Sequence, residues 1–94
     1  MFRHIVMYKL KDKNDAKTMC EKFKTLPQNI SEVVSLEAGT DIQNSDASFD
    51  VVLNVTFKSR EDYLKYKDHP YHVNEVMSYV HSVIAQRYSV DFEI

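Results

Sequence analysis

Glycine is almost absent from this sequence, which has one glycine, two prolines and one cysteine among 94 residues. A single glycine leaves no material for a flexible linker or for a glycine-rich loop that wraps a phosphate. The lone Cys20 excludes an intramolecular disulfide and is typical of a reducing compartment. Two classes of protein, the phosphate-loop enzymes and the disulfide-rich secreted domains, are therefore disfavoured.

Long apolar runs and basic blocks are also missing. The first residues, MFRHIVMYKLKDK, lack an apolar run of the length that a signal peptide or a membrane span needs. The formal net charge is −2, with lysines and glutamates interspersed. A nucleic-acid partner is disfavoured by this charge. We therefore expect a soluble, cytoplasmic protein with neither a nucleic-acid nor a membrane partner.

Apolar residues make up 44% of the chain, enough for one globular domain spanning residues 1–94. The spacing of these residues predicts strands, where apolar residues alternate, and helices, where they recur every three or four positions. The expected elements are a strand at 2–11, a helix at about 15–26, strands at about 33–42 and 49–57, a kinked helix from Ser59, and a strand at 87–94. This order, β-α-β-β-α-β, predicts an α+β, ferredoxin-like fold with a four-stranded antiparallel sheet and helices on one face.

Two breaker residues give more local predictions. Pro27 is expected to end the first helix, because proline lacks the backbone donor that a helix interior requires. Gly39, inside the second strand, suggests a β-bulge or a close approach of another backbone.

The segment from Ser59 to His81 contains most of the polar chemistry in the chain. Ser59 can cap a helix that a break at His69-Pro70 interrupts, since Pro70 biases the preceding residue away from helical angles. Pro70 also suits the first turn of a new helix, with Asp68 or His69 as its cap. We therefore predict a helix, a break and a second helix in a new direction.

One face of the predicted sheet has no local element to cover it. Its apolar residues come from the first and last strands and are Ile5, Met7, Tyr88, Val90, Phe92 and Ile94. Apolar surface of this extent is rarely left exposed in a monomer. We therefore expect a homodimer in which the helix-free sheet faces pack against each other.

With this topology, several short segments resemble the stress-responsive A/B barrel (Dabb) family. They are HIV at 4–6, LEAGTDI at 36–42, FDVVLNVTF at 49–57, SRED at 59–62 and HPYH at 69–72. The resemblance covers essentially the whole chain and implies a dimeric α+β barrel, in agreement with the covered-face argument. It says less about activity, because most family members have no assigned reaction.

One branch of this family, the olivetolic acid cyclase-like proteins, closes a linear polyketide by an intramolecular aldol condensation without cofactor or metal. The resemblance implies that Tyr66, His72, His4 and Asp91 are the corresponding catalytic candidates. A neutral His72 could take a proton from carbon, while the Tyr66 hydroxyl holds the developing enolate oxygen. His4 and Asp91 could form a pair that orients the site or binds a polar end of the ligand.

A structural interpretation of the same residues is also open. His72 and Pro70 could simply fix the kink, with imidazole nitrogens bonding backbone groups that the break frees. His4 and Asp91 could be a pair joining neighbouring strands. The last strand also places Arg87 and Ser89 on the face of Asp91, where a cyclase-like cavity would favour aliphatic residues.

Four functions therefore remain open from the sequence. The first is a small-molecule binding protein that takes a small apolar or aromatic ligand between sheet and helices. The second is a cofactor-free cyclase or related proton-transfer enzyme, and the third, by analogy of fold, is a haem- or quinol-type monooxygenase. The fourth is a scaffolding dimer whose interior is filled by Phe23, Leu53 and Met77. We expect no cofactor, and the histidine spacing does not favour a metal site.

Overall fold

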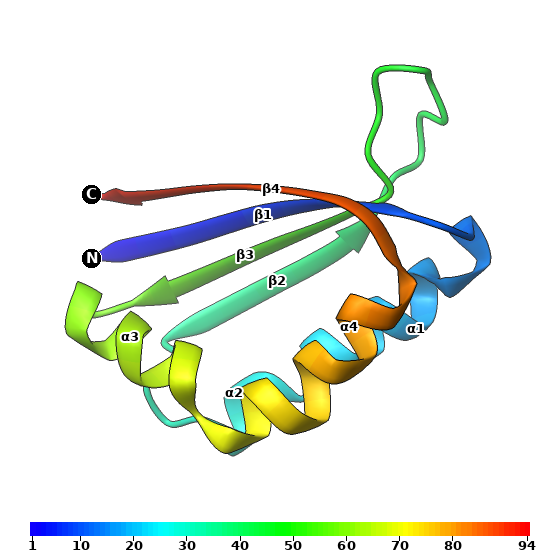
Figure 1. Cartoon of the computed structure of the whole chain (residues 1–94). Helices are drawn as coiled ribbons and strands as arrows, with labels where there is room; N and C mark the ends of the chain where they lie inside the picture. The colour runs from blue at the N-terminus through cyan, green and yellow to red at the C-terminus, as the bar shows by residue number, and fades with distance from the viewer.

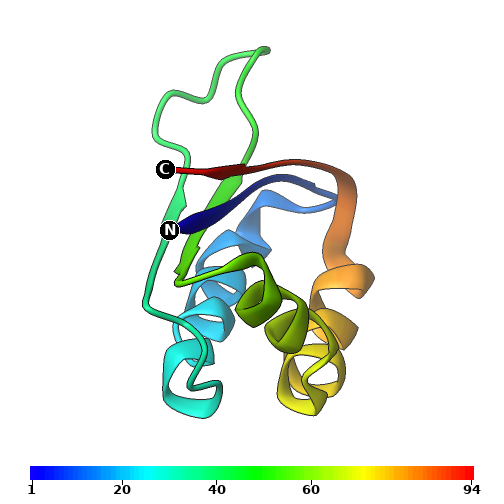
Figure 2. The same ribbon diagram turned by 90° about the vertical axis from the view of Figure 1, so that its left-hand side faces the viewer.

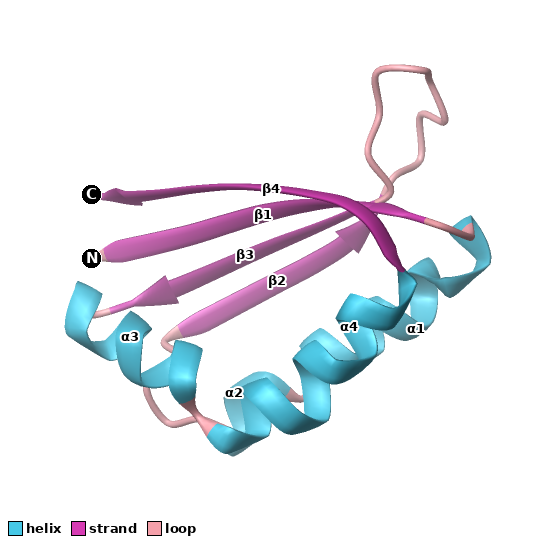
Figure 3. Ribbon diagram, in the orientation of Figure 1, coloured by secondary structure: helices cyan, strands magenta, loops and turns pink.

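A computed structural model describes all residues from Met1 to Ile94. Its strands are β1 (Phe2–Leu10), β2 (Ser35–Thr40), β3 (Val51–Phe57) and β4 (Ile84–Glu93). Its helical elements are a short 3-10 helix η1 (Lys13–Asp15), α1 (Ala16–Phe23), α2 (Leu26–Asn29), α3 (Arg60–Asp68), a π-helix η2 (Tyr71–Met77) and α4 (Ser78–Val83). Figure 3 colours the helices and strands along the chain.

The four strands form one antiparallel sheet in the order β2-β3-β1-β4. The predicted β-α-β-β-α-β order and ferredoxin-like arrangement are thereby confirmed. In the register of β1 with β4, His4 lies opposite Asp91 and Tyr8 lies opposite Arg87. Residues directly opposite each other share a face of the sheet, so these four side chains lie on one side.

All the helices cover one face of the sheet (Figure 1). Figure 2 shows the same layering end-on, with the loop between β2 and β3 rising on the opposite side of the sheet. The core lies between sheet and helices. Its fully buried members include Val6, Tyr8, Met19, Phe23, Leu26, Leu53, Val55, Phe57, Val76 and Val80.

The opposite face of the sheet is apolar and open in the single chain. Its exposed large apolar residues are Met7, Val52, Tyr88, Val90 and Phe92, with Ile94 at the chain end. On β4 these alternate with Arg87, Ser89 and Asp91, which lie on the helix side. The predicted uncovered face is therefore present, and Val52 extends it onto β3.

The first helical region differs from the expected single helix over 15–26. α1 already ends at Phe23, and Pro27 lies in the first turn of the separate helix α2 instead of ending α1. A proline in the first turn costs no helical hydrogen bond, because the donors there have no partner within the helix. The prediction that Pro27 terminates the helix was wrong for this reason.

The strand boundaries were approximately right, except at β4. Strand β4 begins at Ile84, three residues before the predicted 87, directly after α4 ends at Val83. Gly39 pairs regularly with Val52, so the predicted bulge is absent. A Cβ at Gly39 would meet the Val52 side chain at 3.8 Å, an ordinary contact, so no close approach demands glycine.

The break at His69-Pro70 is confirmed in detail. Helix α3 begins with a cap in which the Ser59 hydroxyl accepts from the Asp62 N–H, and it ends at Asp68. His69 is extended, with ψ of 133°, and its Nδ1 accepts from the Tyr71 N–H at 3.1 Å. The next segment is the π-helix η2 where the sequence predicted a regular helix. None of these helices combines the length and apolarity needed to cross a bilayer.

Candidate functional site

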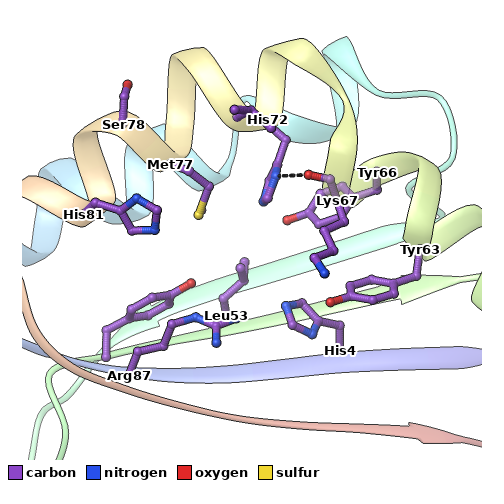
Figure 4. A pocket seen from close by; sticks show the side chains of 12 residues that line it. His4, Leu53, Tyr63, Tyr66, Lys67, His72, Met77, Ser78, His81 and Arg87 are labelled. Atoms are coloured by element: carbon purple, nitrogen blue, oxygen red, sulfur yellow. Dashed lines mark hydrogen bonds between the residues drawn. The ribbon is translucent and has the colours of Figure 1, made fainter.

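A cavity of about 440 Å³ lies between the helix-facing side of the sheet and the segment α3–η2–α4 (Figure 4). The sheet contributes His4 and Tyr8 from β1, Leu53 from β3 and Arg87 from β4. The helices contribute Tyr63, Tyr66, Lys67, His72, Val73, Met77, Ser78 and His81. Leu53 and Met77 thus line an open space and do not fill it, which contradicts the filled interior that a pure scaffold would have.

The cavity exists because the helices do not cover the sheet evenly. They pack mainly on β1, β2 and β3, and the edge strand β4 is exposed along most of its length. The helix-facing side chains of β4 therefore border open space. Arg87 reaches this space from β4, while the kinked helical segment forms the opposite wall (Figure 4).

His72 is held by the helix break itself. Its Nδ1 lies 2.9 Å from the main-chain oxygen of Lys67. In an uninterrupted helix that oxygen would accept from the Tyr71 N–H, which here donates to His69. A carbonyl only accepts, so Nδ1 carries the proton, and the neutral ring keeps an unprotonated Nε2. The structural contact expected for His72 is present, and it also fixes the tautomer that a base requires.

His4 and Asp91 form the second pair that the sequence predicted. The His4 Nδ1 lies 2.5 Å from the Asp91 carboxylate, across the β1–β4 register. The carboxylate accepts, so His4 also carries its proton on Nδ1 when neutral. The His4 ring packs against Tyr63, with centroids 4.9 Å apart. A carboxylate on one nitrogen orients the ring and leaves the other nitrogen for chemistry.

Tyr66 is the most unusual of the four candidates. Only 1% of the residue is exposed, and its buried hydroxyl has no hydrogen-bond partner in the protein. Its ring contacts His72, with centroids 4.4 Å apart. Burial raises the pKa of the Tyr66 hydroxyl strongly, so the group is a neutral donor at physiological pH. An unpaired buried hydroxyl is uncommon, because it forgoes the hydrogen bonds it makes in water.

Burial lowers the pKa of both candidate histidines. For His4, desolvation outweighs the opposing hydrogen bond and charge of Asp91. For His72, desolvation outweighs the opposing bond to the Lys67 carbonyl, and the Arg87 charge lowers the pKa further. Both rings are therefore neutral at pH values above 6.5 and can accept a proton there.

Several cavity residues were missed as site candidates from the sequence. The sequence patterns did not single out Tyr8, Tyr63, Lys67 or His81, and all four line the cavity. His81 is exposed and also borders the cavity. Arg87 was noticed only as a departure from an aliphatic lining. Its even spacing from Asp91 on an alternating strand was the one sequence signal that placed it on the same face.

The side chains of the structure do not form a recognisable metal site. The structure brings together no three His, Cys, Asp or Glu side chains in a metal-binding arrangement. Cys20 is buried, and burial raises the pKa of its thiol, so it is protonated at neutral pH. The chemistry available in the cavity is that of imidazole, phenol, guanidinium and ammonium groups.

The lowered pKa values predict the pH dependence of stability. Between pH 6.5 and the lower native pKa values of His4 and His72, the unfolded state binds more protons than the folded state. The free energy of unfolding should therefore fall as the pH drops through this interval, and level off with respect to these groups below it. Urea unfolding at a series of pH values, with NMR titration of both rings, measures this. A His4→Gln/His72→Gln double variant should lose the slope, and a slope of opposite sign would contradict the assignment.

Comparison with known proteins gives one family and many similar structures. The model of the stress responsive A/B barrel domain (Dabb) matches residues 2–94. No significant match is found among curated protein sequences.

Three solved structures illustrate the similarity of fold. A dimeric protein of unknown function with a ferredoxin-like fold from Bacteroides fragilis is 26% identical, with a TM-score of 0.83 over 99% of this chain and 95% of that one. A Dabb family protein from Mesorhizobium loti is 22% identical, with a TM-score of 0.82 over 99% and 95%. The hydroxynitrile lyase of Passiflora edulis is 20% identical, with a TM-score of 0.84 over 99% and 92%. The last two likenesses concern the fold alone. Since the family model spans nearly the whole sequence, the chain belongs to the stress-responsive A/B barrel (Dabb) domain family.

Proposed function

We propose that this Dabb protein is a homodimer that binds a small molecule with an apolar or aromatic body in the cavity between sheet and helices. The observation that carries this proposal is the buried, unpaired hydroxyl of Tyr66, which borders a cavity of about 440 Å³. A ligand oxygen that accepted from this hydroxyl would supply the missing hydrogen bond. The protein would then gain a contact that the empty fold lacks.

The composition of the cavity supports the same conclusion. Small-molecule sites are typically concave, about 300–1,000 Å³ in volume, and lined by apolar and aromatic side chains with a few polar groups. Here Leu53, Val73 and Met77 provide apolar surface, and Tyr63 and Tyr66 provide aromatic faces. The imidazoles of His4 and His72 provide the few groups that can fix a ligand's orientation.

A ligand panel with a matched pair of tyrosine variants tests this proposal. The panel contains linear polyketide mimics, aromatic acids, fatty acids, quinones and haem, and the readout is the thermal midpoint, which a ligand of the native state raises. Tyr66→Phe should weaken binding of the selected ligand by about three- to tenfold, the value of one neutral hydrogen bond. Tyr79→Phe is the control, because the Tyr79 hydroxyl is also buried and unpaired but does not line the cavity.

A selective shift that Tyr66→Phe reduces and Tyr79→Phe leaves unchanged is the expected result. No shift from any class of compound would contradict ligand binding in this cavity. Haem is included because similar barrels carry haem- and quinol-type monooxygenases, and a Soret band on its addition would favour that alternative function.

The apolar sheet face supports the dimer. Tyr88 and Val90 are more than half exposed in the single chain, at 61% and 56%, and the strand register places them on the same sheet face as Met7 and Val52. The Bacteroides fragilis relative is described as dimeric. Two copies that pack this face together would remove the patch from water and form the two sheets of an α+β barrel. The single buried Cys20 suits a reducing compartment, and we propose the cytoplasm as the location.

Val90→Glu should convert the dimer to a monomer, because it would place two unpaired carboxylates in an apolar interface. Size-exclusion chromatography with light scattering measures the molar mass at matched concentrations. Leu64→Glu is the control, since Leu64 is a similarly exposed apolar residue on helix α3, away from this face. A wild-type mass of one chain, or a dimer that survives Val90→Glu, would contradict the proposed interface.

A second candidate function is cofactor-free proton transfer to or from carbon, as in a polyketide cyclase-like reaction. It is favoured by the fixed tautomers, because His4 and His72 each engage Nδ1 and keep Nε2 unprotonated. His72 would act as the base, with Tyr66 donating to the developing enolate oxygen. His4, oriented by Asp91, would bind or polarise the other end of the substrate.

Deuterium exchange into a ketone tests the proton-transfer candidate. The protein should accelerate exchange of the α-protons of benzylacetone in D₂O, followed by NMR. His72→Gln should slow the accelerated exchange by about 10²–10⁴-fold, as expected for loss of a general base. His81→Gln, at an exposed position of the same cavity, should retain most of the rate. A rate that survives His72→Gln in the folded protein would contradict this role, and a His72→Gln variant that fails to fold would favour the structural interpretation.

A further inference from the structure

The charges around the cavity are unbalanced. Its lining includes two cations, Arg87 and Lys67, and no aspartate or glutamate, while the imidazoles of His4 and His72 are neutral at physiological pH. The chain as a whole is slightly acidic, with 14 Asp and Glu against 12 Lys and Arg. Cationic side chains are therefore concentrated where the ligand would lie, although the protein's net charge has the opposite sign.

Arg87 has no carboxylate partner. The ion pairs of the structure are His4 with Asp91 and Lys9 with Asp50, and neither involves Arg87. The nearest candidate on its own strand face, Asp91, is already bonded to His4. The planar guanidinium of an arginine can donate two parallel hydrogen bonds to a carboxylate or phosphate, so an arginine without a partner in a cavity wall can bind such a group.

Arg87 forms part of the cavity wall on the edge strand β4. Its side chain rises from β4 toward the space between Leu53 and the helical wall (Figure 4). Its charge acts on the titratable groups of both walls, lowering the pKa of His4 and His72 and opposing the raised pKa of Tyr66. Lys67 enters the cavity from the opposite wall, on helix α3 (Figure 4). A ligand between the two walls would meet positive charge from both sides.

We propose that the ligand carries a carboxylate, which Arg87 binds, while its apolar body lies against Tyr63, Leu53 and Met77. The proposal rests on the ligand-binding function described above and names the chemical class of the ligand. A carboxylate fits one guanidinium fork, whereas phosphate sites use several converging backbone amides, often from glycine-rich loops, and the single glycine, Gly39, does not line the cavity. Lys67 would add a second, more mobile positive charge.

This arrangement assigns different parts of the ligand to different groups. The carboxylate at Arg87 anchors one end, and the neutral hydroxyl of Tyr66 is left to donate to a second oxygen, such as a ketone. The requirement for an anion distinguishes the site from a purely apolar pocket, which would bind an acid more weakly than a neutral compound of the same shape.

Pairs of acids and amides with the same apolar body test the proposal. The probes are cinnamate and cinnamamide, benzoate and benzamide, and octanoate and octanamide, each titrated into the 94-residue protein at neutral pH by NMR. The wild type should bind at least one acid about ten times more tightly than its amide, as expected for a charged hydrogen-bonded pair at a partly exposed site. Arg87→Gln should abolish this preference while changing the amide affinity less than about threefold.

Two control variants separate the local contact from general electrostatics. Arg60→Gln removes the same charge from the exposed start of helix α3, outside the cavity, and should leave the preference intact. Arg87→Lys keeps the charge but loses the fork, and should restore only part of the preference.

The outcomes distinguish this proposal from the function on which it rests. If an acid and its amide bind in the cavity with equal affinity, or Arg87→Gln weakens both equally, the carboxylate assignment is overturned and ligand binding stands. If no acid and no amide binds, both the ligand-binding function and this assignment fall.

Discussion

The missing backbone N–H of Pro70 is the constraint on which the candidate site depends. Proline prevents helix α3 from continuing, and His69 takes an extended conformation whose ring captures the Tyr71 N–H. The Lys67 carbonyl then lacks its helical donor, and the His72 Nδ1–H donates a hydrogen bond to it. One residue type therefore accounts for the change of helix direction, the position of His72 and its tautomer. The structural and the chemical interpretation of His72 are consequently compatible, since the bond that fixes the kink also prepares the ring.

The opposite wall depends on strand register. His4 meets Asp91 only because β1 and β4 pair with these residues directly opposite each other. Backbone pairing thus sets the position of the imidazole, and the carboxylate then sets its rotation. The two histidines reach the same cavity from a strand and from a helix, and each has Nδ1 engaged by a different kind of acceptor.

The sequence was sufficient for the architecture, because alternation along the strands and helical spacing elsewhere are strong, local signals. It also predicted the break at His69-Pro70, and three of its four candidate residues, His4, Tyr66 and His72, line the cavity. It failed at Pro27, where a residue that can end a helix instead begins one, and at Gly39, where a regular strand pair accommodates glycine.

The interior of the site was beyond the reach of sequence patterns. The unpaired hydroxyl of Tyr66 depends on which side chains from distant elements fail to reach it. The grouping of Lys67 with Arg87 depends on the angle between a helix and an edge strand. No periodicity or motif in the sequence predicts either property, because both depend on how distant elements are arranged in three dimensions.

Both faces of strand β4 belong to a proposed binding surface, because its side chains alternate between the cavity side and the apolar side of the sheet. Arg87 lines the cavity and Asp91 bonds to the cavity residue His4, while Tyr88, Val90 and Phe92 form the apolar face on the other side. Because side chains of a strand alternate strictly, inserting or deleting one residue near position 86 would exchange the two sets. The charges would then move to the apolar face and the aromatic rings into the cavity. Point substitutions in β4 can alter one surface at a time, but a change in its length alters both, so the segment's length is under a stricter constraint than any of its side chains.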